Sequence, residues 1–333
     1  MTLRITATVE RWPVAGQFII ARGAKQFVDV ILVTVSDGQH IGYGEGTAIY
    51  YRGETAENCV GQVERVMDDL TAHDAVTARN LVQSLMPPGA ARNAVDCALW
   101  DLEAKQTATP LWKLAGLGRP PVALQTAFTI SLGTPDRMAQ DASAAAANGY
   151  TLLKLKLQGQ GDLDRVAAVR AGAPACRMIV DANESWSAAD IGPLTGALNK
   201  LGVAIVEQPL SPERDFELAA VRGDLPIFAD ESCHSAADVD RLRDLYQGIN
   251  IKLDKAGGLT EAMLLAKAAD DAGLDYMVGC MLSTSLGIAP AFIVAQGAAW
   301  VDLDGPALLA QDRPEGFQFS GGYVMPNDRV TTA

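Results

Sequence analysis

Hydrophobic and polar positions alternate with a period of two in much of the first third of the chain. Residues 27–36 follow this pattern, the Ser-Asp-Gly triplet 36–38 marks a turn, and residues 40–47 carry the chain back. A period of two is typical of strands, so we expect a β-hairpin here. Two helical patterns follow, one that begins after Thr55 and one over residues 88–105. The first third is therefore predicted to be an α+β lobe.

From residue 122 onward, short β-rich runs alternate with mostly helical, Ala-rich stretches. The runs lie near residues 122–130, 151–157, 177–183, 203–209, 226–232, 249–255, 275–281 and 299–305. Strands that alternate with helices at this spacing pair in parallel, and eight of them close naturally into a barrel. We expect an α/β fold, a (β/α)7β barrel of the TIM type with an α+β capping domain.

Glycine and proline clusters mark the candidate domain boundaries. The segment 116–121 (Gly-Leu-Gly-Arg-Pro-Pro) cannot continue a helix, and Pro306 breaks the chain after the eighth predicted strand. We expect a capping domain over residues 1–117 and a barrel over residues 118–305. The tail, 306–333, is expected to return to the first lobe and complete the capping domain.

Composition narrows the function classes. The chain has 333 residues, of which 49% are hydrophobic, and a formal charge of −13 with Lys and Arg scattered along it. This charge argues against nucleic acid or an anionic membrane as partner and favours a small molecule. The five cysteines are far apart, no targeting segment can be read, and no apolar run is long enough to span a membrane. A cytoplasmic protein fits these features best.

Acidic residues stand at the ends of three consecutive predicted barrel strands. Asp181 lies at the end of the third strand, Glu207 of the fourth and Asp230 of the fifth. Because the active site of such a barrel lies at the carboxyl ends of its strands, these carboxylates are expected side by side. Oxygen ligands without thiolate or imidazole suit Mg²⁺, and the chain has only three histidines. A magnesium site is therefore predicted, and a zinc site is disfavoured.

Lysines flank the acidic residues on both sides. Lys154 and Lys156 lie on one face of the second strand, because side chains alternate, and Lys252 lies on the sixth. Removal of a proton beside a carboxylate builds negative charge, which requires a base near the proton and a cation where the charge develops. Lysine and metal together meet both requirements for an enolate-forming enzyme.

Each of these residues has an ordinary structural interpretation when it is taken alone. A lysine pair in a strand commonly forms a solvated face, and an acidic residue after a strand commonly caps the next helix. Charged residues nevertheless coincide at six of the eight strand ends. Buried charges are tolerated only when they are paired or bound to a metal. We therefore interpret the set as one active site.

The strand-end motifs resemble those of the muconate-lactonising subgroup of the enolase superfamily. They are KLK (154–156), DAN (181–183), EQP (207–209), DES (230–232) and NIKLDKAGG (250–258), in this order. The resemblance covers the whole chain and implies the same barrel and capping lobe. It implies one Mg²⁺ per subunit, held by Asp181, Glu207 and Asp230, and a possible homo-oligomer.

The same resemblance assigns roles to the lysines. It implies that Lys156 and Lys252 are the acid/base pair and that Lys154 is an auxiliary lysine. Within the subgroup, Asp302 and Asp304 on the eighth strand resemble the DxD motif of L-Ala-D/L-Glu dipeptide epimerases, which holds the substrate ammonium group. The alternative for this pair is a loop-capping turn.

A capping-lobe loop around residues 16–26 is expected to close over the substrate. Residues 19–23 (Ile-Ile-Ala-Arg-Gly) resemble the epimerase segment whose arginine meets a glutamate side chain. Arg22 is therefore a candidate specificity residue, and its alternative is a solvated loop arginine.

Together these features predict a dipeptide epimerase of the Ala-Glu type, an isomerase that moves one proton through an enolate intermediate. The resemblance implies a role in cell-wall peptide metabolism. N-acylamino-acid racemisation, o-succinylbenzoate synthesis and cycloisomerisation use the same lysines and metal, but give no reason for an ammonium site on the eighth strand. A metal-dependent barrel hydrolase and a non-catalytic binding barrel are the alternatives from other classes.

Overall fold

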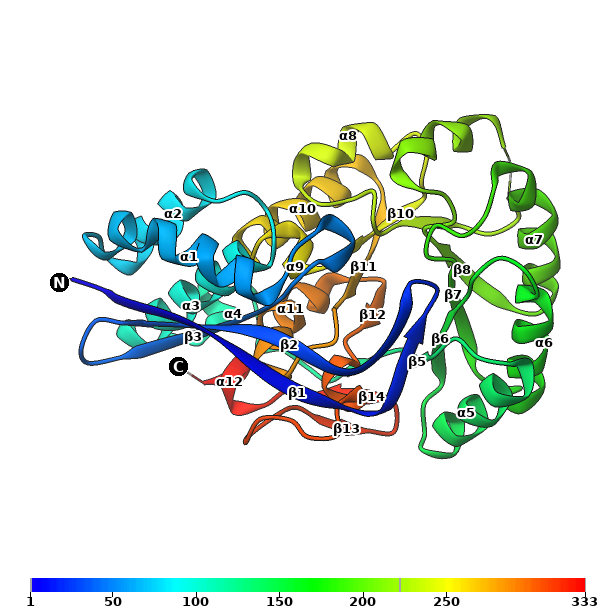
Figure 1. The fold of residues 1–333 in the computed structure, drawn as a ribbon, viewed down its shortest axis with the longest axis horizontal. Coiled ribbons are helices and arrows are strands. Elements are labelled where there is room, and N and C mark those ends of the chain that lie inside the picture. Colours follow the sequence, from blue (N-terminus) through cyan, green and yellow to red (C-terminus); the bar gives the residue numbers. More distant parts are fainter. Residues whose placement is uncertain (1, 222, 333) are drawn as a thin grey trace.

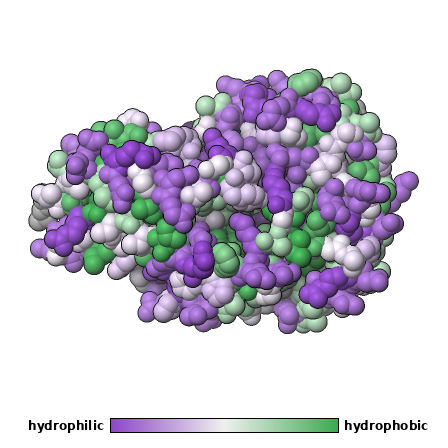
Figure 2. Space-filling model, in the orientation of Figure 1, coloured by the Kyte–Doolittle hydropathy of each residue, from purple (hydrophilic) through white to green (hydrophobic). Residues whose placement is uncertain are grey.

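A computed structural model describes residues 2–221 and 223–332 and places them in two lobes (Figure 1). The smaller lobe contains the N-terminal sheet and helices, and the larger lobe contains the barrel. Figure 2 shows polar residues spread over this face, with hydrophobic residues scattered among them on both lobes. Within the described ranges, no helix has the length and hydropathy needed to cross a membrane.

The smaller lobe is built on a three-stranded antiparallel sheet. Its strands are β1 (Arg4–Ile20), β2 (Gly23–Ser36) and β3 (Ile41–Thr47), in that order. Their pairing confirms the predicted hairpin between residues 27–36 and 40–47. The two long strands β1 and β2 reach across the barrel lobe in Figure 1, with a register shift between Pro13 and Phe18.

Three helices accompany this sheet, namely α1 (Ala56–Thr71), α2 (Ala75–Leu85) and α3 (Ala90–Gln106). Helices α1 and α3 pack on the strands, and α2 packs on α3 and α1. Thr55 caps α1, as its sequence pattern predicted, by accepting a hydrogen bond from the backbone N–H of Asn58. Gly42 and Gly44 of β3 lie directly against the α3 backbone, where an added Cβ would come within 2.1 and 2.0 Å of carbonyl oxygens. The glycines thus allow the sheet and α3 to approach closely.

The larger lobe is the predicted barrel of eight parallel strands, which confirms the fold class. The backbone N–H of Ala127, just before the first barrel strand, donates to the carbonyl of Val301 in the last at 2.8 Å, so the sheet closes. The strands are β5 (Phe128–Ile130), β6 (Leu152–Lys156), β7 (Arg177–Asp181), β8 (Val203–Glu207), β9 (Ile227–Ala229), β10 (Gly248–Ile251), β11 (Asp275–Gly279) and β12 (Trp300–Asp302).

Helices connect the barrel strands and line its outer side, as α5, α6 and α7 do at the right of Figure 1. The connection after β8 differs from an ideal repeat, because its described part forms the 3-10 helix η2 (Pro212–Ala220). The α-helices are α5 (Pro135–Ala147), α6 (Asp162–Gly172), α7 (Ala188–Lys200), α8 (Val239–Leu242), α9 (Leu253–Ala256), α10 (Leu259–Ala272) and α11 (Ser285–Val294).

The first predicted barrel strand needs a correction. Residues 122–130 form two strands, and the first, β4 (Leu124–Gln125), pairs with β14 (Tyr323–Met325) instead of a barrel strand. Strand β13 (Gln318–Ser320) completes this small sheet. The tail therefore contacts both lobes, since Ala310 also donates its N–H to the carbonyl of Pro13 in β1. The last helix, α12 (Asp328–Thr331), packs near α11 and the short helix α4 (Leu111–Leu114).

Candidate active site

Three carboxylates meet at the carboxyl ends of consecutive barrel strands. Asp181 is the last residue of β7, it pairs in register with Glu207 at the end of β8, and Asp230 directly follows β9. One oxygen atom from each lies within 4.8 Å of the other two, and all three side chains are buried. The parallel register thus gathers the residues that the strand-end pattern predicted to be neighbours.

Lysines contact this acidic group from two sides. Lys156 Nζ on β6 lies 2.6 Å from Asp181 Oδ2, and Lys252 Nζ lies 2.7 Å from Asp230 Oδ2. Burial lowers the pKa of Lys252, but the surrounding groups, Asp230 first and then Glu207, together outweigh this effect and raise the pKa above its usual range. Both lysines line the same small cavity of about 70 Å³, which Asn183 and Asp230 also line.

Lys154 lies deeper in the barrel than the other two lysines. Its Nζ is 2.7 Å from Glu207 and 2.8 Å from Asp302, and its side chain is buried. Burial lowers its pKa, but the Asp302 and Glu207 carboxylates outweigh this effect and raise the pKa well above its usual range. The position is consistent with a supporting cation that offsets the carboxylate charge.

The carboxylate group has the properties of a Mg²⁺ site. Glu207 Oε2 and Asp230 Oδ1 are buried and accept no hydrogen bond of good geometry among the described residues. Their only close contacts there are ion pairs, with Lys154 at 2.7 Å and with Lys255 at 2.6 Å. Burial, with Asp181 as an additional cause, raises the pKa of Glu207 to about 7. A divalent cation would relieve this crowding of negative charge, and carboxylate oxygens are its preferred ligands. These residues therefore fit the predicted metal.

The backbone is strained where β7 and β8 end. Asn183 and Gln208 both have a positive φ, of 44° and 36°. The Asn183 N–H donates to Asp181 Oδ1, while Gln208 Oε1 accepts from the backbone N–H groups of Asp230 and Ser232. Such strain persists only when surrounding contacts hold it, and here those contacts orient two of the candidate metal ligands.

The predicted mobile loop is a regular hairpin. Residues 16–26 form the ends of β1 and β2, with a turn at residues 21–22. The tip lies on the barrel, because the Leu132 N–H donates to the Ile19 carbonyl at 2.8 Å. In this position the hairpin covers the cavity at the strand ends, as the sequence predicted for a closing segment.

Arg22, at the hairpin tip, forms ion pairs with two barrel residues. One guanidinium nitrogen contacts Glu184, and the other lies 2.8 Å from Glu231 Oε1. Burial lowers the pKa of Arg22, but Glu231 and Glu184 outweigh it, so the pKa is raised. Arg22 lines the cavity, although its charge is already compensated by these two carboxylates.

Asp302 and Asp304 are both buried at the end of β12, but they make different contacts. Asp302 Oδ2 accepts from Lys154, whereas Oδ1 has no partner among the described residues. Asp304 Oδ2 accepts from the backbone N–H of Thr129 at 2.6 Å. Burial and then the neighbouring Asp302 raise the pKa of Asp304 to about 7. The pair thus retains one unpartnered oxygen atom, on Asp302.

Alternation of side chains along the sixth strand would place Asp254 on the same face as Asn250 and Lys252, but the structure places it elsewhere. The strand ends at Ile251 and helix α9 begins at Leu253, so side-chain alternation stops before this residue. Asp254 Oδ1 instead accepts from the Thr47 N–H and from Asn93 Nδ2 of the smaller lobe. It is therefore an interdomain contact.

Two contributors to the site were not assigned roles from the sequence. Lys255 Nζ is fully buried 2.6 Å from Asp230 Oδ1, and Asn250 Nδ2 donates to Glu207 Oε1 at 2.7 Å. Asn250 in β10 could have been assigned a role because it lies two residues before Lys252, and side chains two apart in a strand share a face. Lys255 could not, since one turn of α9 returns it to the strand ends and no strand period predicts this.

Two family models match the chain. The model described as mandelate racemase / muconate lactonizing enzyme, N-terminal domain, matches residues 2–116, and the model described as enolase C-terminal domain-like matches residues 137–330. The two matches correspond to the smaller lobe and to most of the barrel with its tail.

Similar proteins agree with this assignment. The chain is 41% identical to an L-Ala-D/L-Glu epimerase of Escherichia coli K12, and the match covers 95% of this chain and 97% of that protein. It is 38% identical to an N-acetyl-D-glutamate racemase of Pseudoalteromonas, and that match covers 89% of this chain and 93% of the relative. A crystal structure from Agrobacterium tumefaciens, of an enolase family member with homology to dipeptide epimerases, superposes with a TM-score of 0.95. The two sequences are 45% identical, and the superposition covers 99% of this chain and 100% of the Agrobacterium chain. That crystal structure contains sodium and L-Ala-L-Glu. The chain therefore belongs to the mandelate racemase/muconate lactonizing enzyme family of the enolase superfamily.

Proposed function

We propose that this protein is a dipeptide epimerase of the Ala-Glu type that moves one proton at an α-carbon beside a carboxylate. The observation that carries the proposal is the placement of Lys156 and Lys252 on opposite sides of the carboxylate group, both facing one cavity. Relatives named as epimerases and racemases support the reaction class, an isomerase.

We propose Mg²⁺ as the cofactor, one per subunit, held by Asp181, Glu207 and Asp230. When bound, it supplies positive charge beside the substrate carboxylate and so stabilises the enolate that forms on proton removal. The site's own lysines must then separate from Asp181 and Asp230 and point at the substrate.

Epimerisation requires two proton-transfer groups that approach the α-carbon from opposite faces. Lys156 and Lys252 come from β6 and from the residue after β10, which lie across the barrel mouth from each other. An α-carbon held between them presents one face to each lysine. One lysine removes the proton, the other delivers a proton to the opposite face, and the roles reverse in the reverse direction.

The amino-terminal residue of the dipeptide is proposed to lie toward β12. Its ammonium group is a suitable partner for Asp302, whose Oδ1 atom is buried without a hydrogen bond among the described residues. The nearby Asp304 adds a second carboxylate. A substrate with a blocked amine lacks the cation that this pair would bind.

N-acylamino-acid racemisation is the second candidate function. It is favoured by the 38% identity to an N-acetyl-D-glutamate racemase over most of both chains. The same two lysines and the same metal would serve that reaction. The two candidates differ in the group next to the reacting carbon, a free ammonium group in one and an acyl group in the other.

The test is a direct comparison of L-Ala-L-Glu with N-acetyl-L-glutamate, with Mg²⁺ and after its removal by a chelator. We expect chiral chromatography to show metal-dependent epimerisation of the dipeptide at a much higher kcat/KM than racemisation of the acylated amino acid. Faster turnover of N-acetylglutamate would establish the second candidate instead. Activity that survives chelation in an Asp230→Asn variant would contradict the enolate mechanism altogether.

Several finer expectations accompany this proposal. We propose that residues 1–117, completed by 306–333, form the capping domain, and that residues 118–305 form the barrel. A cytoplasmic location and a role in cell-wall peptide metabolism are proposed as well, and the first is supported by five cysteines that are all free thiols. A homo-oligomer remains a prediction that light scattering can check.

A further inference from the structure

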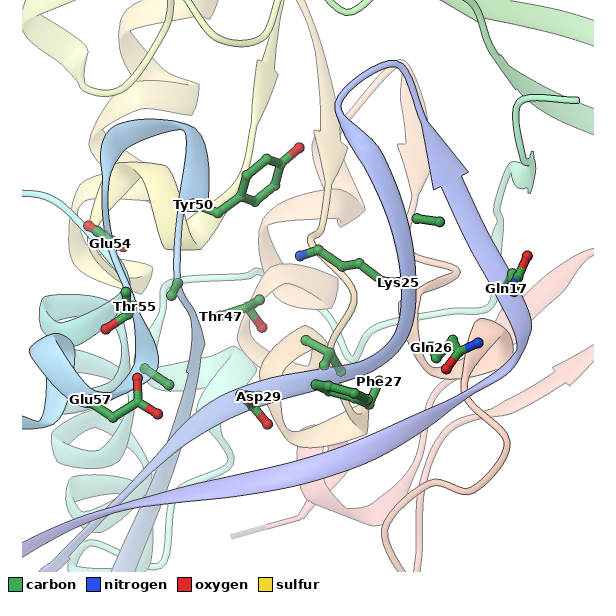
Figure 3. Close-up of a pocket in the computed structure, with 14 residues that line it drawn as sticks. Gln17, Lys25, Gln26, Phe27, Asp29, Thr47, Tyr50, Glu54, Thr55 and Glu57 are labelled. Atoms are coloured by element: carbon green, nitrogen blue, oxygen red, sulfur yellow. The ribbon is translucent and has the colours of Figure 1, made fainter.

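Lys25 lies between two neighbouring cavities. One is the cavity at the strand ends, and the other is a more open groove of about 490 Å³ between the hairpin and the start of α1. Both cavities are lined by Lys25 and Tyr50. Figure 3 shows the Lys25 side chain projecting from the hairpin strand toward Tyr50, and its Nζ lies 4.5 Å from the ring centroid.

Lys25 differs from the other cations of the inner cavity in lacking a carboxylate partner. Arg22, Lys156 and Lys252 all form ion pairs at 2.8 Å or less. For Lys25, no carboxylate among the described residues lies within 4.0 Å of its ammonium group. Its nearest acidic neighbour in β2, Asp29, is bound by Arg11 through two hydrogen bonds of 2.7 and 2.8 Å.

Unlike Lys25, Arg22 does not have a free positive charge that could bind an anionic group of the substrate. Its two partners, Glu184 and Glu231, leave the three residues with one net negative charge when all are ionised. An anionic group that approached Arg22 would have to displace one of them. Lys25 is half-buried and has no ion-pair partner among the described residues, so a carboxylate beside it would gain a charge-assisted contact without displacing another ion.

The place of the substrate side chain follows from the proposed function. The reacting α-carbon lies between Lys156 and Lys252, its carboxylate faces the metal ligands, and the amino-terminal residue lies toward β12. The rest of the cavity wall is formed by Tyr50 and Tyr51, by residues 280–282, and by the hairpin, which contributes the cations Arg22 and Lys25. An acidic side chain on the epimerised residue is therefore expected to point at the hairpin, the part of this wall that carries positive charge.

We infer that Lys25 binds the anionic side chain of the epimerised residue, and that Arg22 is a positioning residue that holds the hairpin on the barrel. This inference rests on the proposed function and revises the specificity role that the sequence suggested for Arg22. It identifies the preferred substrates as dipeptides with an acidic side chain on the carboxy-terminal residue.

The experiment compares L-Ala-L-Glu with L-Ala-L-Gln, which have nearly the same shape but differ in side-chain charge. Dissociation constants are measured by calorimetry with Mg²⁺ present, for the wild type and for Lys25→Met, Lys25→Arg and Lys200→Met. Lys200 is an exposed lysine at the end of α7, outside both cavities, and serves as the matched control. We expect Lys25→Met to weaken L-Ala-L-Glu binding about 10- to 100-fold and L-Ala-L-Gln binding less than about 2-fold.

Lys25→Arg should retain most of the preference for L-Ala-L-Glu, and Lys200→Met should change neither constant. Equal losses for both dipeptides in Lys25→Met, or no loss for either, would overturn the inference. A charge-specific loss in Arg22→Met but not in Lys25→Met would return the role to Arg22. A dissociation constant can be measured whether or not the dipeptide is epimerised, so failure of the wild type to epimerise either dipeptide would contradict the proposed function separately.

Discussion

At the scale of single residues, the buried acids outside the metal site have distinct tasks. Asp302 keeps one oxygen atom unpartnered among the described residues, whereas Asp254 is bound by Thr47 and Asn93 of the smaller lobe. Both carboxylates are buried, so each must find a compensating partner. For Asp302, Lys154 is one partner and the substrate ammonium group is proposed as the second, whereas for Asp254 both partners belong to the protein itself.

Replacing both strand-end aspartates, in Asp302→Asn/Asp304→Asn, should impair free dipeptides selectively. The substrate ammonium group would remain unpaired in a closed site, which costs on the order of 2–5 kcal/mol in transition-state binding. N-acetylated dipeptides should lose far less, because they carry no such cation. Steady-state kinetics with both substrate types would measure this, and equal losses would assign the two aspartates a structural role.

The buried carboxyl group of Asp254 should make the free energy of unfolding depend on pH. Burial is the main cause that raises its pKa to about 7, above the unfolded value of about 4. The folded state therefore binds more protons than the unfolded state between these values, and this contribution to stability is lost as pH rises from about 4 to 7. Asp254→Asn keeps the oxygen that accepts both hydrogen bonds.

The free energy of unfolding of Asp254→Asn should therefore increase relative to that of the wild type as pH rises from about 4 to 7. The increase should be at most about 4 kcal/mol, and it should not grow further above pH 7. Urea denaturation of both proteins at several pH values measures the difference. A difference that does not change between pH 4 and 8 would show that Asp254 is already ionised in the folded protein at low pH.

At the scale of elements, the β1–β2 hairpin carries both Arg22 and Lys25 to the barrel. Its tip turns at Gly23, whose φ of +137° disfavours any residue with a side chain. An added Cβ at this position meets no atom within 4 Å, so a substitution there acts through the backbone alone. A substitution at Gly23 can therefore change the backbone conformation of the hairpin tip without placing a side chain in the cavity.

Gly23→Val should displace the hairpin tip and raise KM for dipeptides by about 5- to 30-fold, from about 1–2 kcal/mol of backbone strain. Gly38→Val is the matched control, because Gly38 also has a positive φ and open space but lies in the β2–β3 turn away from the site. Melting temperatures should fall similarly in both variants. An increase in KM in both variants, or in neither, would contradict the role of the tip.

The sequence predicted the regular elements well where local pattern and burial agree. The barrel strands are continuous buried runs bounded by helices, so β6 to β12 were found close to their observed bounds. The pairing of β4 with β14 was not predictable, because each is a two- or three-residue strand whose partner lies about 200 residues away. Short strands of this kind are defined by tertiary contacts and not by a period.

The candidate site was predictable to a similar degree and for a related reason. The carboxyl ends of parallel strands converge, so motifs at those ends predicted that Asp181, Glu207 and Asp230 lie together. The ion pairs of Arg22 and the isolation of Lys25 depend on how the hairpin docks on the barrel. That contact joins segments more than 100 residues apart, and no local pattern encodes it.

At the scale of the whole molecule, one arginine of the tail ties the lobes together. Arg313 Nη2 lies 2.6 Å from Glu10 and 2.9 Å from Glu45, and Glu45 is buried in β3. The same Glu45 carboxylate accepts from the N–H of Thr284, which follows β11 of the barrel. Closure of the active site by the smaller lobe therefore depends on this buried network.

Arg313→Met should destabilise the protein by about 3–5 kcal/mol, because it leaves Glu45 buried without a counter-charge. The double variant Arg313→Met/Glu45→Gln should recover part of this loss, and Arg119→Met at an exposed site should be neutral. Urea denaturation measures all three. A single variant as stable as the wild type would show that the network does not hold the lobes together.

The central claim is that Lys156 and Lys252 act on opposite faces of one α-carbon, and hydrogen exchange in D₂O tests it most directly. Neither Lys156→Ala nor Lys252→Ala should epimerise the dipeptide. Each variant should still exchange the α-proton of one epimer slowly, through its remaining lysine, and the two variants should prefer opposite epimers in mass spectra or NMR. If either variant interconverts the epimers at near wild-type rate, or if both variants exchange the same epimer, the two-lysine mechanism is wrong.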